Sequence, residues 1–246
     1  METALLGPRG HPHRDRVDGG DDMAPYSPEH WAALMVIAVA TPLLVWAVRG
    51  RDVNTWITVA GWVMLVVSVW WMGWDMRPTV FDVQRSLPLH LSDMARLTTS
   101  LALITRKWWW VAPTYYWGLT LNVQSLLTPD LSYFVDPRLE YLMYWLLHAA
   151  VFIAPIVLVW GRGMRPTWTW YQVTWVFSLA WMAVTMLINV VTGSNYGYLN
   201  AHPPGRSLLD AMGPWPTYLG VGCGILAVTW AGMTWPWEKL RKRRSA

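Results

Sequence analysis

Nucleophilic and ionisable side chains gather in one short stretch of the chain, LPLHLSDMAR. It holds His90, Ser92, Asp93 and Arg96 among apolar neighbours. Residues three or four apart lie on one face of a helix, so Asp93 can pair with Arg96 and can also orient the ring of His90. The simpler interpretation of each residue is structural, with an ion pair for Asp93 and Arg96 and helix packing for Ser92.

A histidine further along the chain, His148, could act on Ser92 as a base. A serine beside a histidine is the minimal pair for acyl transfer, because the histidine removes the hydroxyl proton and returns it to the leaving group. We therefore predict Ser92 as the nucleophile and His148 as the base. Asp93 or Asn122 would orient the base, and Arg96 would bind a phosphate or a developing oxyanion.

Other polar side chains sit near the ends of apolar segments that are expected to face the same side. Together with His90, Asp93 and Arg96 they form a predicted supporting cluster, whose further members are Asn122, Gln124, Asn195, Tyr196 and Asp210. Each of these has a simpler interpretation, since amide side chains often satisfy loop backbone. Their convergence on one side is what favours a functional site.

Metal and cofactor chemistry find little support in the sequence. His90, Asp93 and His148 are metal-binding residue types, but no close-spaced ligand motif joins them, so no metal site is predicted. No GxGxxG, phosphate-binding loop or GxSxG sequence is present, and no cofactor is expected. The single cysteine, Cys223, excludes an intramolecular disulfide and is expected to be a packing residue.

The composition indicates how these side chains are held. Of the 246 residues, 54% are hydrophobic and only 14% are charged, whereas soluble domains carry about 25% charged residues. The 21 tryptophans fit a membrane protein, because tryptophan is favoured where bilayer and water meet. The net charge of +4 comes from residues between and after apolar segments, so membrane topology explains it better than nucleic-acid binding does.

The chain is predicted to be an all-α, polytopic membrane helix bundle with about seven transmembrane helices. A spanning helix needs about 20 apolar residues. The candidate segments are 31–48, 55–74, 87–105, 109–127, 139–160, 168–193 and 214–235. The third and fourth contain more polar residues than the others. A disordered tail is expected over 1–28, the membrane domain over 29–238 and a basic cytoplasmic tail over 239–246.

Lysine and arginine counts predict the orientation. With the C-terminus in the cytoplasm, eleven of these residues fall inside and seven outside, with Arg96 left within a helix. The N-terminus is therefore expected outside. At about 1.5 Å per residue, Ser92 lies about 8 Å and His148 about 14 Å below the outer surface. The predicted site is thus in the outer half of the bilayer.

Five segments resemble the YwaF-like family of bacterial integral membrane proteins, in the same order along most of residues 55–235. They are LPLHLSD (87–93), YYWGLTLNVQSLLTPDL (115–131), EYLMYWLLH (140–148), TGSNYGYL (192–199) and SLLDAMGPWPTY (207–218). The resemblance implies a multi-pass protein of the bacterial plasma membrane.

That family is similar in turn to an animal multi-spanning acyltransferase that builds polyunsaturated ether phospholipids, and to membrane hydrolases of fatty-acid esters of hydroxy fatty acids. The resemblance implies a nucleophile at Ser92 and a histidine at His148. The family has cysteine in an HLC-type sequence where this chain has Ser92. Serine is the weaker nucleophile unless a base activates it.

Three functions follow from these observations. The first is a lipid acyltransferase or lipid esterase with an intramembrane Ser/His site and membrane lipids as substrate. The second is a transporter or channel for a small polar solute, although no inverted repeat is found and polar groups thin out toward the inner helix ends. The third is a non-catalytic membrane subunit. The sequence does not identify a protein partner.

Overall fold

Long apolar segments of the chain form helices whose starts are marked by capping residues. The computed structural model describes residues 25–129, 133, 135–202 and 208–245. The α-helices are α1 (Pro28–Val48), α2 (Asn54–Asp75), α3 (Leu91–Thr105), α4 (Trp108–Leu119), α5 (Leu121–Leu127), α6 (Pro137–Ile156), α7 (Trp168–Thr192) and α8 (Thr217–Ser245). A π-helical turn, η2 (Val157–Gly161), extends α6, and the 3-10 turns η3 (Tyr196–Tyr198) and η4 (Leu208–Met212) precede α8.

Side-chain caps fix the first turns of three helices. The Ser27 hydroxyl accepts from a backbone amide at the start of α1, Asp136 does so at α6, and Thr167 at α7. In α1 and α6 the cap is followed by proline, which has no amide to leave unsatisfied. The sequence therefore sets the starts of these helices locally.

The prediction of an all-helical chain is confirmed for the described residues, none of which lies in a strand. Five helical stretches are long and apolar enough to cross a membrane: Pro28–Val48, Asn54–Asp75, Pro137–Gly161, Trp168–Thr192 and Thr217–Arg243. The third and fourth expected spans form shorter helices, so seven complete spans and the orientation of the termini stay predictions.

The two shorter segments depart from the prediction in different ways. Residues 87–90 precede the helix, and α3 begins only at Leu91. The segment 109–127 is broken at Thr120 into α4 and α5. The Thr120 hydroxyl donates to the carbonyl of Tyr116 at 2.5 Å, a bond that competes with the regular helix ladder and bends it.

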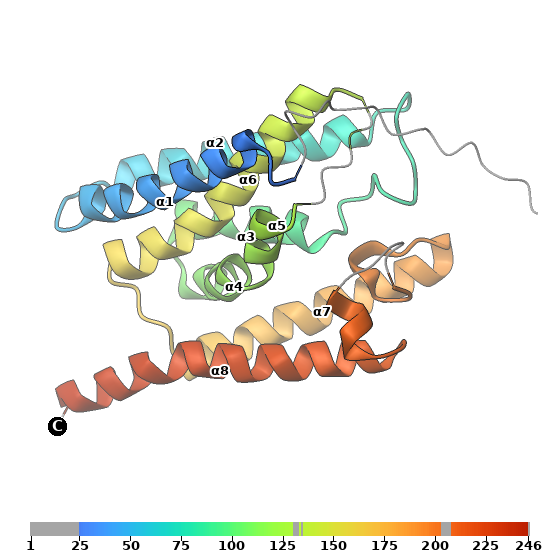
Figure 1. Ribbon diagram of the computed structural model, residues 1–246. Coiled ribbons are helices and arrows are strands. Elements are labelled where there is room, and N and C mark those ends of the chain that lie inside the picture. Colours follow the sequence, from blue (N-terminus) through green and yellow to red (C-terminus); the bar gives the residue numbers. More distant parts are fainter. Residues whose placement is uncertain (1–24, 130–132, 134, 203–207, 246) are drawn as a thin grey trace, which may run out of the picture.

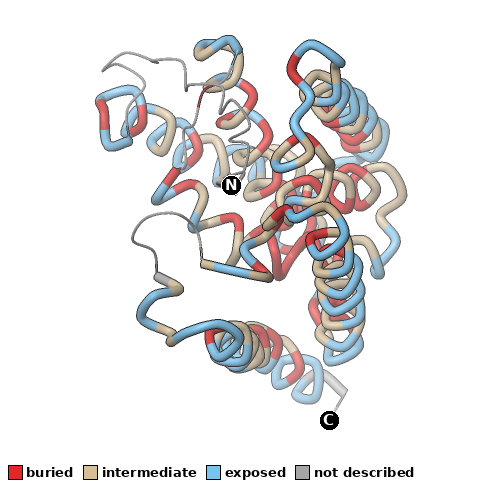
Figure 2. The backbone as a smooth tube through the Cα atoms, turned by 90° about the vertical axis from the view of Figure 1, so that its right-hand side faces the viewer, coloured by how far each residue is buried: buried red, intermediate tan, exposed pale blue. Residues whose placement is uncertain are grey.

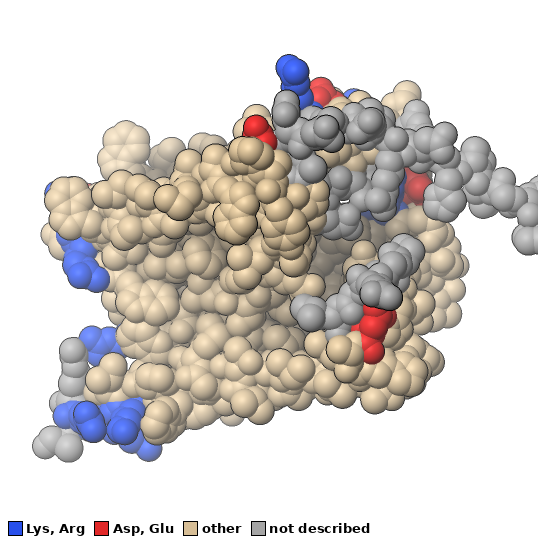
Figure 3. Space-filling view, in the orientation of Figure 1, with Lys and Arg blue, Asp and Glu red and all other residues tan. Residues whose placement is uncertain are grey.

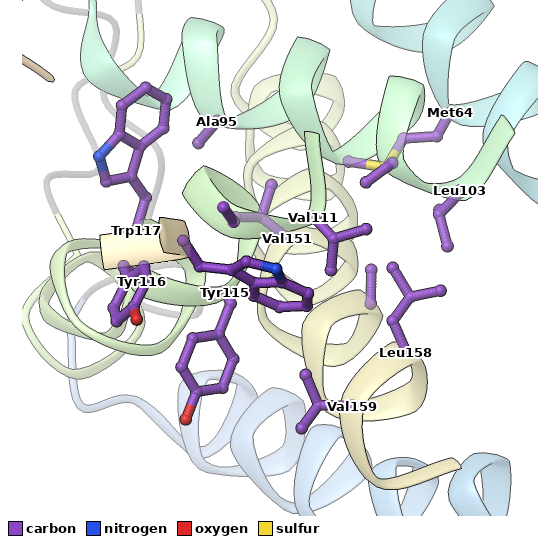
Figure 4. Packing of buried hydrophobic residues seen from close by; sticks show 14 of the residues in the cluster. Met64, Ala95, Leu103, Val111, Tyr115, Tyr116, Trp117, Val151, Leu158 and Val159 are labelled. Atoms are coloured by element: carbon purple, nitrogen blue, oxygen red, sulfur yellow. The ribbon is translucent and has the colours of Figure 1, made fainter. Parts of the chain in front are cut away.

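Helix α4 lies at the centre of the bundle. Its residues from Val111 to Gly118 are all buried, and they pack against α3, α6 and α7. Figure 4 shows aromatic side chains of this helix in one cluster with apolar residues of α2, α3, α6 and η2. In Figure 2 buried residues gather toward the middle of the bundle while exposed ones follow the outward faces. Many of those exposed residues are large and apolar, as expected for lipid-facing helices.

Close backbone approach holds α4 against α6. A Cβ atom at Gly118 would lie 2.5 Å from the carbonyl oxygen of Val151 and 3.1 Å from Cγ of Pro155. Gly61 has the same role between α2 and α3, where a Cβ atom would lie 2.8 Å from side-chain and backbone atoms of Ile104. Small residues at helix crossings are typical of membrane bundles, where packing replaces the hydrophobic driving force.

Helices α7 and α8 form a pair on one side of α4 (Figure 1). Polar contacts join this pair to α4 and to the break that follows it. The hydroxyls of Tyr116 and Thr234 lie 2.6 Å apart, and Trp230 Nε1 donates to the Thr120 hydroxyl at 3.1 Å. These contacts bury polar groups of α4 and α8 together, so α8 is held by hydrogen bonds as well as by apolar packing.

Basic residues of three joints lie at one end of the bundle. Arg162 donates to the carbonyl of Arg51 at 2.7 Å and to Asn54 Oδ1 at 3.0 Å, and Arg106 donates to Thr58 at 2.8 Å. Figure 3 shows Lys and Arg side chains near the end where α8 finishes, with an uncharged band over most of the visible face. The lysine and arginine counts predicted that Arg51, Arg106 and Arg162 lie on the cytoplasmic side.

The terminal segments differ in what the structure describes. Most of the predicted tail 1–28 lies outside the described residues. The segment 239–246, expected as a basic tail after the last span, is helical as far as Ser245 because α8 continues through it. Lys239 lies over the ring of Trp235, with Nζ 4.9 Å from the ring centroid.

Replacing Gly118 with alanine tests the close contact between α4 and α6. We expect Gly118→Ala to destabilise the fold by about 1–3 kcal/mol, because the added methyl group meets a backbone carbonyl that cannot move aside. Thermal unfolding in detergent measures the change. Gly220→Ala in α8 is the matched control, since a Cβ atom there has nothing within 4 Å. Equal midpoints for the two variants would contradict the assigned packing.

Candidate functional site

The predicted nucleophile and the predicted base line one cavity of about 80 Å³ between α3, α4, α5 and α6. We call it the Ser92 cavity. Its lining residues are Leu91, Ser92, Ala95, Trp117, Leu121, Asn122, Ser125 and His148. Ser92 and His148 come from helices separated by α4 and α5 in the sequence, so their meeting is a result of tertiary packing.

Asn122 forms one hydrogen bond with the backbone of His148 and one with its ring. The amide Nδ2 of Asn122 donates to the backbone carbonyl of His148 at 3.0 Å, and Asn122 Oδ1 lies 2.7 Å from His148 Nδ1. Since the amide nitrogen is directed to the carbonyl, the amide oxygen must accept, and His148 Nδ1 therefore carries the proton. This arrangement leaves Nε2 as the ring nitrogen that can take up a proton.

Tyr144 supports the same ring from one helical turn earlier in α6. The two ring centroids lie 4.3 Å apart. The Tyr144 hydroxyl donates to the carbonyl of Ser125 in α5 at 2.6 Å. Sequence reasoning did not select Tyr144, although its spacing of four residues from His148 places both on one helix face. Together with Asn122 it ties α5 to α6 around the histidine.

Ser92 lies in the first turn of α3, where His90 is the N-cap. The side chain is half-buried, and in the described part of the chain its hydroxyl has no hydrogen-bond partner. The backbone amides of Leu91 and Ser92 likewise meet no acceptor among the described residues. The N-terminal end of a helix carries a partial positive charge that favours an anion.

Asp93 and Arg96 serve the start of α3. Asp93 forms an ion pair with Arg96, and its second oxygen accepts from the backbone amide of His90 at 3.0 Å. The His90 ring packs edge-on against Tyr196, with centroids 5.0 Å apart. None of these four residues lines the Ser92 cavity. The hydrogen-bond partner of the His148 ring is therefore Asn122 and not Asp93, whose carboxylate accepts from the backbone amide of His90.

Arg96 is nearly enclosed, with 11% of its side chain exposed. Besides Asp93 it interacts electrostatically with Asp75, at the end of α2. A buried arginine in this setting needs such partners, because an unpaired charge in hydrocarbon is costly. The ion pair with Asp93 anchors the part of α3 that carries Ser92.

The remaining predicted residues organise loops outside the cavity. Asn195 binds backbone groups of Asn200 and Ala201, Asp210 pairs with His202 at 2.9 Å, and Gln124 is exposed. Tyr196 is buried, and its hydroxyl donates to the carbonyl of Val83 at 2.8 Å and accepts from the amide of Leu87 at 2.9 Å. Burial raises the pKa of Tyr196 to about 12, so the hydroxyl keeps its proton for that bond.

Two cavity residues with polar atoms were absent from the predicted cluster. Trp117 forms one wall of the Ser92 cavity, and its Nε1 donates to the Ser178 hydroxyl at 2.9 Å. Ser125 lies on α5 three residues after Asn122, on the same face. Among the described residues no group of three His, Cys, Asp or Glu side chains is arranged to bind a metal ion.

Replacing Asn122 tests the two hydrogen bonds that hold His148. We expect Asn122→Leu to lower stability by about 1–3 kcal/mol, because a buried ring nitrogen loses its acceptor. Thermal unfolding in detergent measures the loss. Gln124→Leu is the control, since Gln124 is an exposed amide on the same short helix. If both variants unfold together, the contact between Asn122 and His148 does not stabilise the protein.

Comparison with protein families gives one match. The model of the TMEM164 family matches residues 25–234, which include every described helix in part or in full. No curated protein and no solved structure matches the chain. The match and the apolar helices together confirm the expectation of a multi-pass integral membrane protein. This chain belongs to the TMEM164 family.

Proposed function

We propose that this protein is a membrane-embedded lipid acyltransferase or lipid esterase that works through an acyl-serine intermediate. The observation that carries the proposal is the Ser92 cavity, where a serine with an unengaged hydroxyl and a histidine of fixed tautomer line the same space. The resemblance to acyltransferases and ester hydrolases of animal membranes supports the same chemistry. Ser92 is the nucleophile, His148 the base and Asn122 the residue that positions the base.

In the first stage His148 Nε2 removes the proton from the Ser92 hydroxyl as its oxygen attacks the carbonyl carbon of a lipid ester. A bond forms between that oxygen and the carbonyl carbon, and the carbonyl oxygen takes the negative charge. When the intermediate collapses, the bond from carbon to the alcohol oxygen breaks. The protonated His148 gives its proton to the departing alcohol, and the acyl group stays on Ser92.

In the second stage a hydroxyl group attacks the acyl-serine ester. His148 removes its proton, and the bond between the acyl carbon and Ser92 breaks with return of the proton to the serine oxygen. A lysolipid hydroxyl as acceptor makes the reaction an acyl transfer, and water makes it a hydrolysis. An apolar setting that limits access of water favours transfer.

The first turn of α3 supplies electrostatic support for the charged intermediate. Ser92 is in that turn, and the amides of Leu91 and Ser92 meet no other acceptor in the described chain. Backbone amides that need no rearrangement are effective donors to an oxyanion. Arg96 has a different role in this scheme, because its ion pair with Asp93 maintains the helix start.

The cellular setting is part of the proposal. We place the protein in a bacterial plasma membrane, with the N-terminus outside and the Ser92 cavity in the outer half of the bilayer. The lysine and arginine counts on the two sides support this orientation. Membrane lipids then reach the site sideways from the bilayer, and no soluble domain is needed to deliver them.

Covalent labelling tests the role of Ser92 without knowledge of the lipid. A fluorophosphonate probe reacts with activated serine hydroxyls, so we expect the wild-type protein to be labelled and Ser92→Ala and His148→Ala to remain unlabelled. With a labelled phospholipid as donor and a lysophospholipid as acceptor in proteoliposomes, the same variants should lose roughly a thousandfold or more in turnover. Ser92→Cys should keep measurable turnover, because the thiol is the better nucleophile.

Ser100→Ala is the matched control for Ser92→Ala. Ser100 lies on the same helix, is buried and donates to the carbonyl of Arg96 at 2.8 Å, but it does not line the Ser92 cavity. It should be labelled and turn over substrate like the wild type. Unchanged labelling in folded Ser92→Ala protein would remove Ser92 from the mechanism.

A further inference from the structure

A second cavity, of about 70 Å³, adjoins the Ser92 cavity. We call it the α7 cavity. Three residues, Leu91, Trp117 and Leu121, line both cavities. The other lining residues belong to α7 and α8 and are Trp175, Ser178, Leu179, Trp181, Met182, Cys223 and Leu226. The α7 cavity therefore separates the central helices from the α7–α8 pair.

The two cavities differ in chemistry. The Ser92 cavity has four polar side chains on its lining, whereas the α7 cavity has Ser178 as its one hydroxyl among apolar side chains. That hydroxyl is already used, since it accepts from Trp117 Nε1 at 2.9 Å and donates to the carbonyl of Thr174 at 2.8 Å. A ligand in the α7 cavity thus meets hydrocarbon and aromatic surface.

We propose that the α7 cavity binds the hydrocarbon chain of a long-chain fatty acyl group whose carbonyl carbon is attacked by Ser92. The inference rests on the proposed function. A fatty acyl ester has a polar carbonyl directly followed by an unbranched chain, and the two adjoining cavities repeat this order from polar to apolar. Leu91, Trp117 and Leu121 mark the transition between them.

The α7 cavity is too small for a whole fatty acyl chain, so most of the hydrocarbon must extend beyond it. A cavity of about 150 Å³ holds a benzene molecule, so this one accepts only a few methylene groups, which follow the carbonyl and the first carbons held in the Ser92 cavity. The outer part of α8 offers a path onward, because Cβ atoms at Gly220, Gly222 and Gly224 would have nothing within 4 Å. Ile225, beside them, is 49% exposed. The rest of the hydrocarbon chain of the fatty acyl group passes along this open part of α8 into the bilayer.

Figure 1 shows α7 and α8 as a pair set apart from the other helices. On the face drawn in Figure 3 the surface is hollowed between the α7–α8 pair and the helices drawn above it. The hydrogen bonds from α8 to α4 and to Thr120 involve Trp230, Thr234 and Trp237, which follow the cavity residues by one or more turns. The cavity residues Cys223 and Leu226 lie between these bonds and Tyr218, whose hydroxyl donates to the carbonyl of Tyr198.

Substrate chain length tests the α7 cavity in the active protein. Leu226→Trp fills the cavity, so we expect the kcat/KM for a hexadecanoyl ester to fall roughly tenfold or more relative to that for a butanoyl ester. Val228→Trp is the matched control, because Val228 is on the same helix with 76% of its surface exposed. Its ratio of the two constants should equal that of the wild type. An unchanged ratio in Leu226→Trp would overturn the proposal.

The single thiol of the chain gives a second readout that needs no turnover. Cys223 lines the α7 cavity, so we expect hexadecanoyl lysophosphatidylcholine to slow its reaction with N-ethylmaleimide in Ser92→Ala protein. The butanoyl analogue, which is too short to fill both cavities, should leave the rate unchanged. A slower reaction of Cys223 in Ser92→Ala protein, together with no ester turnover by the wild type, would support the binding site and reject the proposed chemistry. Turnover without slowing would reject the α7 cavity as the chain site.

Discussion

Burial of helix α4 is the constraint on which the rest of the structure depends. Eight consecutive residues, Val111–Gly118, have no exposed face, and a polar group enclosed in a membrane bundle must find its partner within the protein. Tyr116 is satisfied by Thr234 on α8, and Trp117 by Ser178 on α7. Those two bonds decide where the α7–α8 pair is placed. On the opposite side Gly118 allows α6 to approach until backbone meets backbone.

The break after α4 has an equally direct effect on the site. Thr120 turns the chain, and α5 then brings Asn122 against His148 of α6. An amide suits this position because it fixes the ring without adding a charge to an apolar interior, where ionised groups are costly. The ionised residues Asp93 and Arg96 are paired with each other at the start of α3. The charged residues Asp93 and Arg96 thus stabilise the start of a helix, whereas hydrogen bonds between uncharged groups of Asn122 and His148 fix the side chains of the cavity.

The sequence predicted much of this because the relevant signals are local. Long apolar segments identify the five membrane-length helices, and the polar cluster His90, Ser92, Asp93 and Arg96, together with a histidine deep in an apolar segment, singles out Ser92 and His148. Tertiary contacts decided what the sequence could not. The break at Thr120 involves Trp230, more than a hundred residues away, and the choice of Asn122 over Asp93 as the partner of His148 depends on how α5 meets α6. Trp117, which lines the cavity, and Tyr144, which packs against the His148 ring, are aromatic residues, which in this tryptophan-rich chain carry no distinguishing pattern.

The two hydrogen bonds between Asn122 and His148 also bear on how the family can diverge. Aspartate at position 122 keeps an acceptor for the ring but loses the donor to the His148 carbonyl, and glutamine places its amide one carbon too far along. A residue other than histidine at 148 leaves the Asn122 oxygen buried without its donor. Each side chain therefore restricts the other through evolution, and relatives of this chain are expected to keep both residues or to lose both.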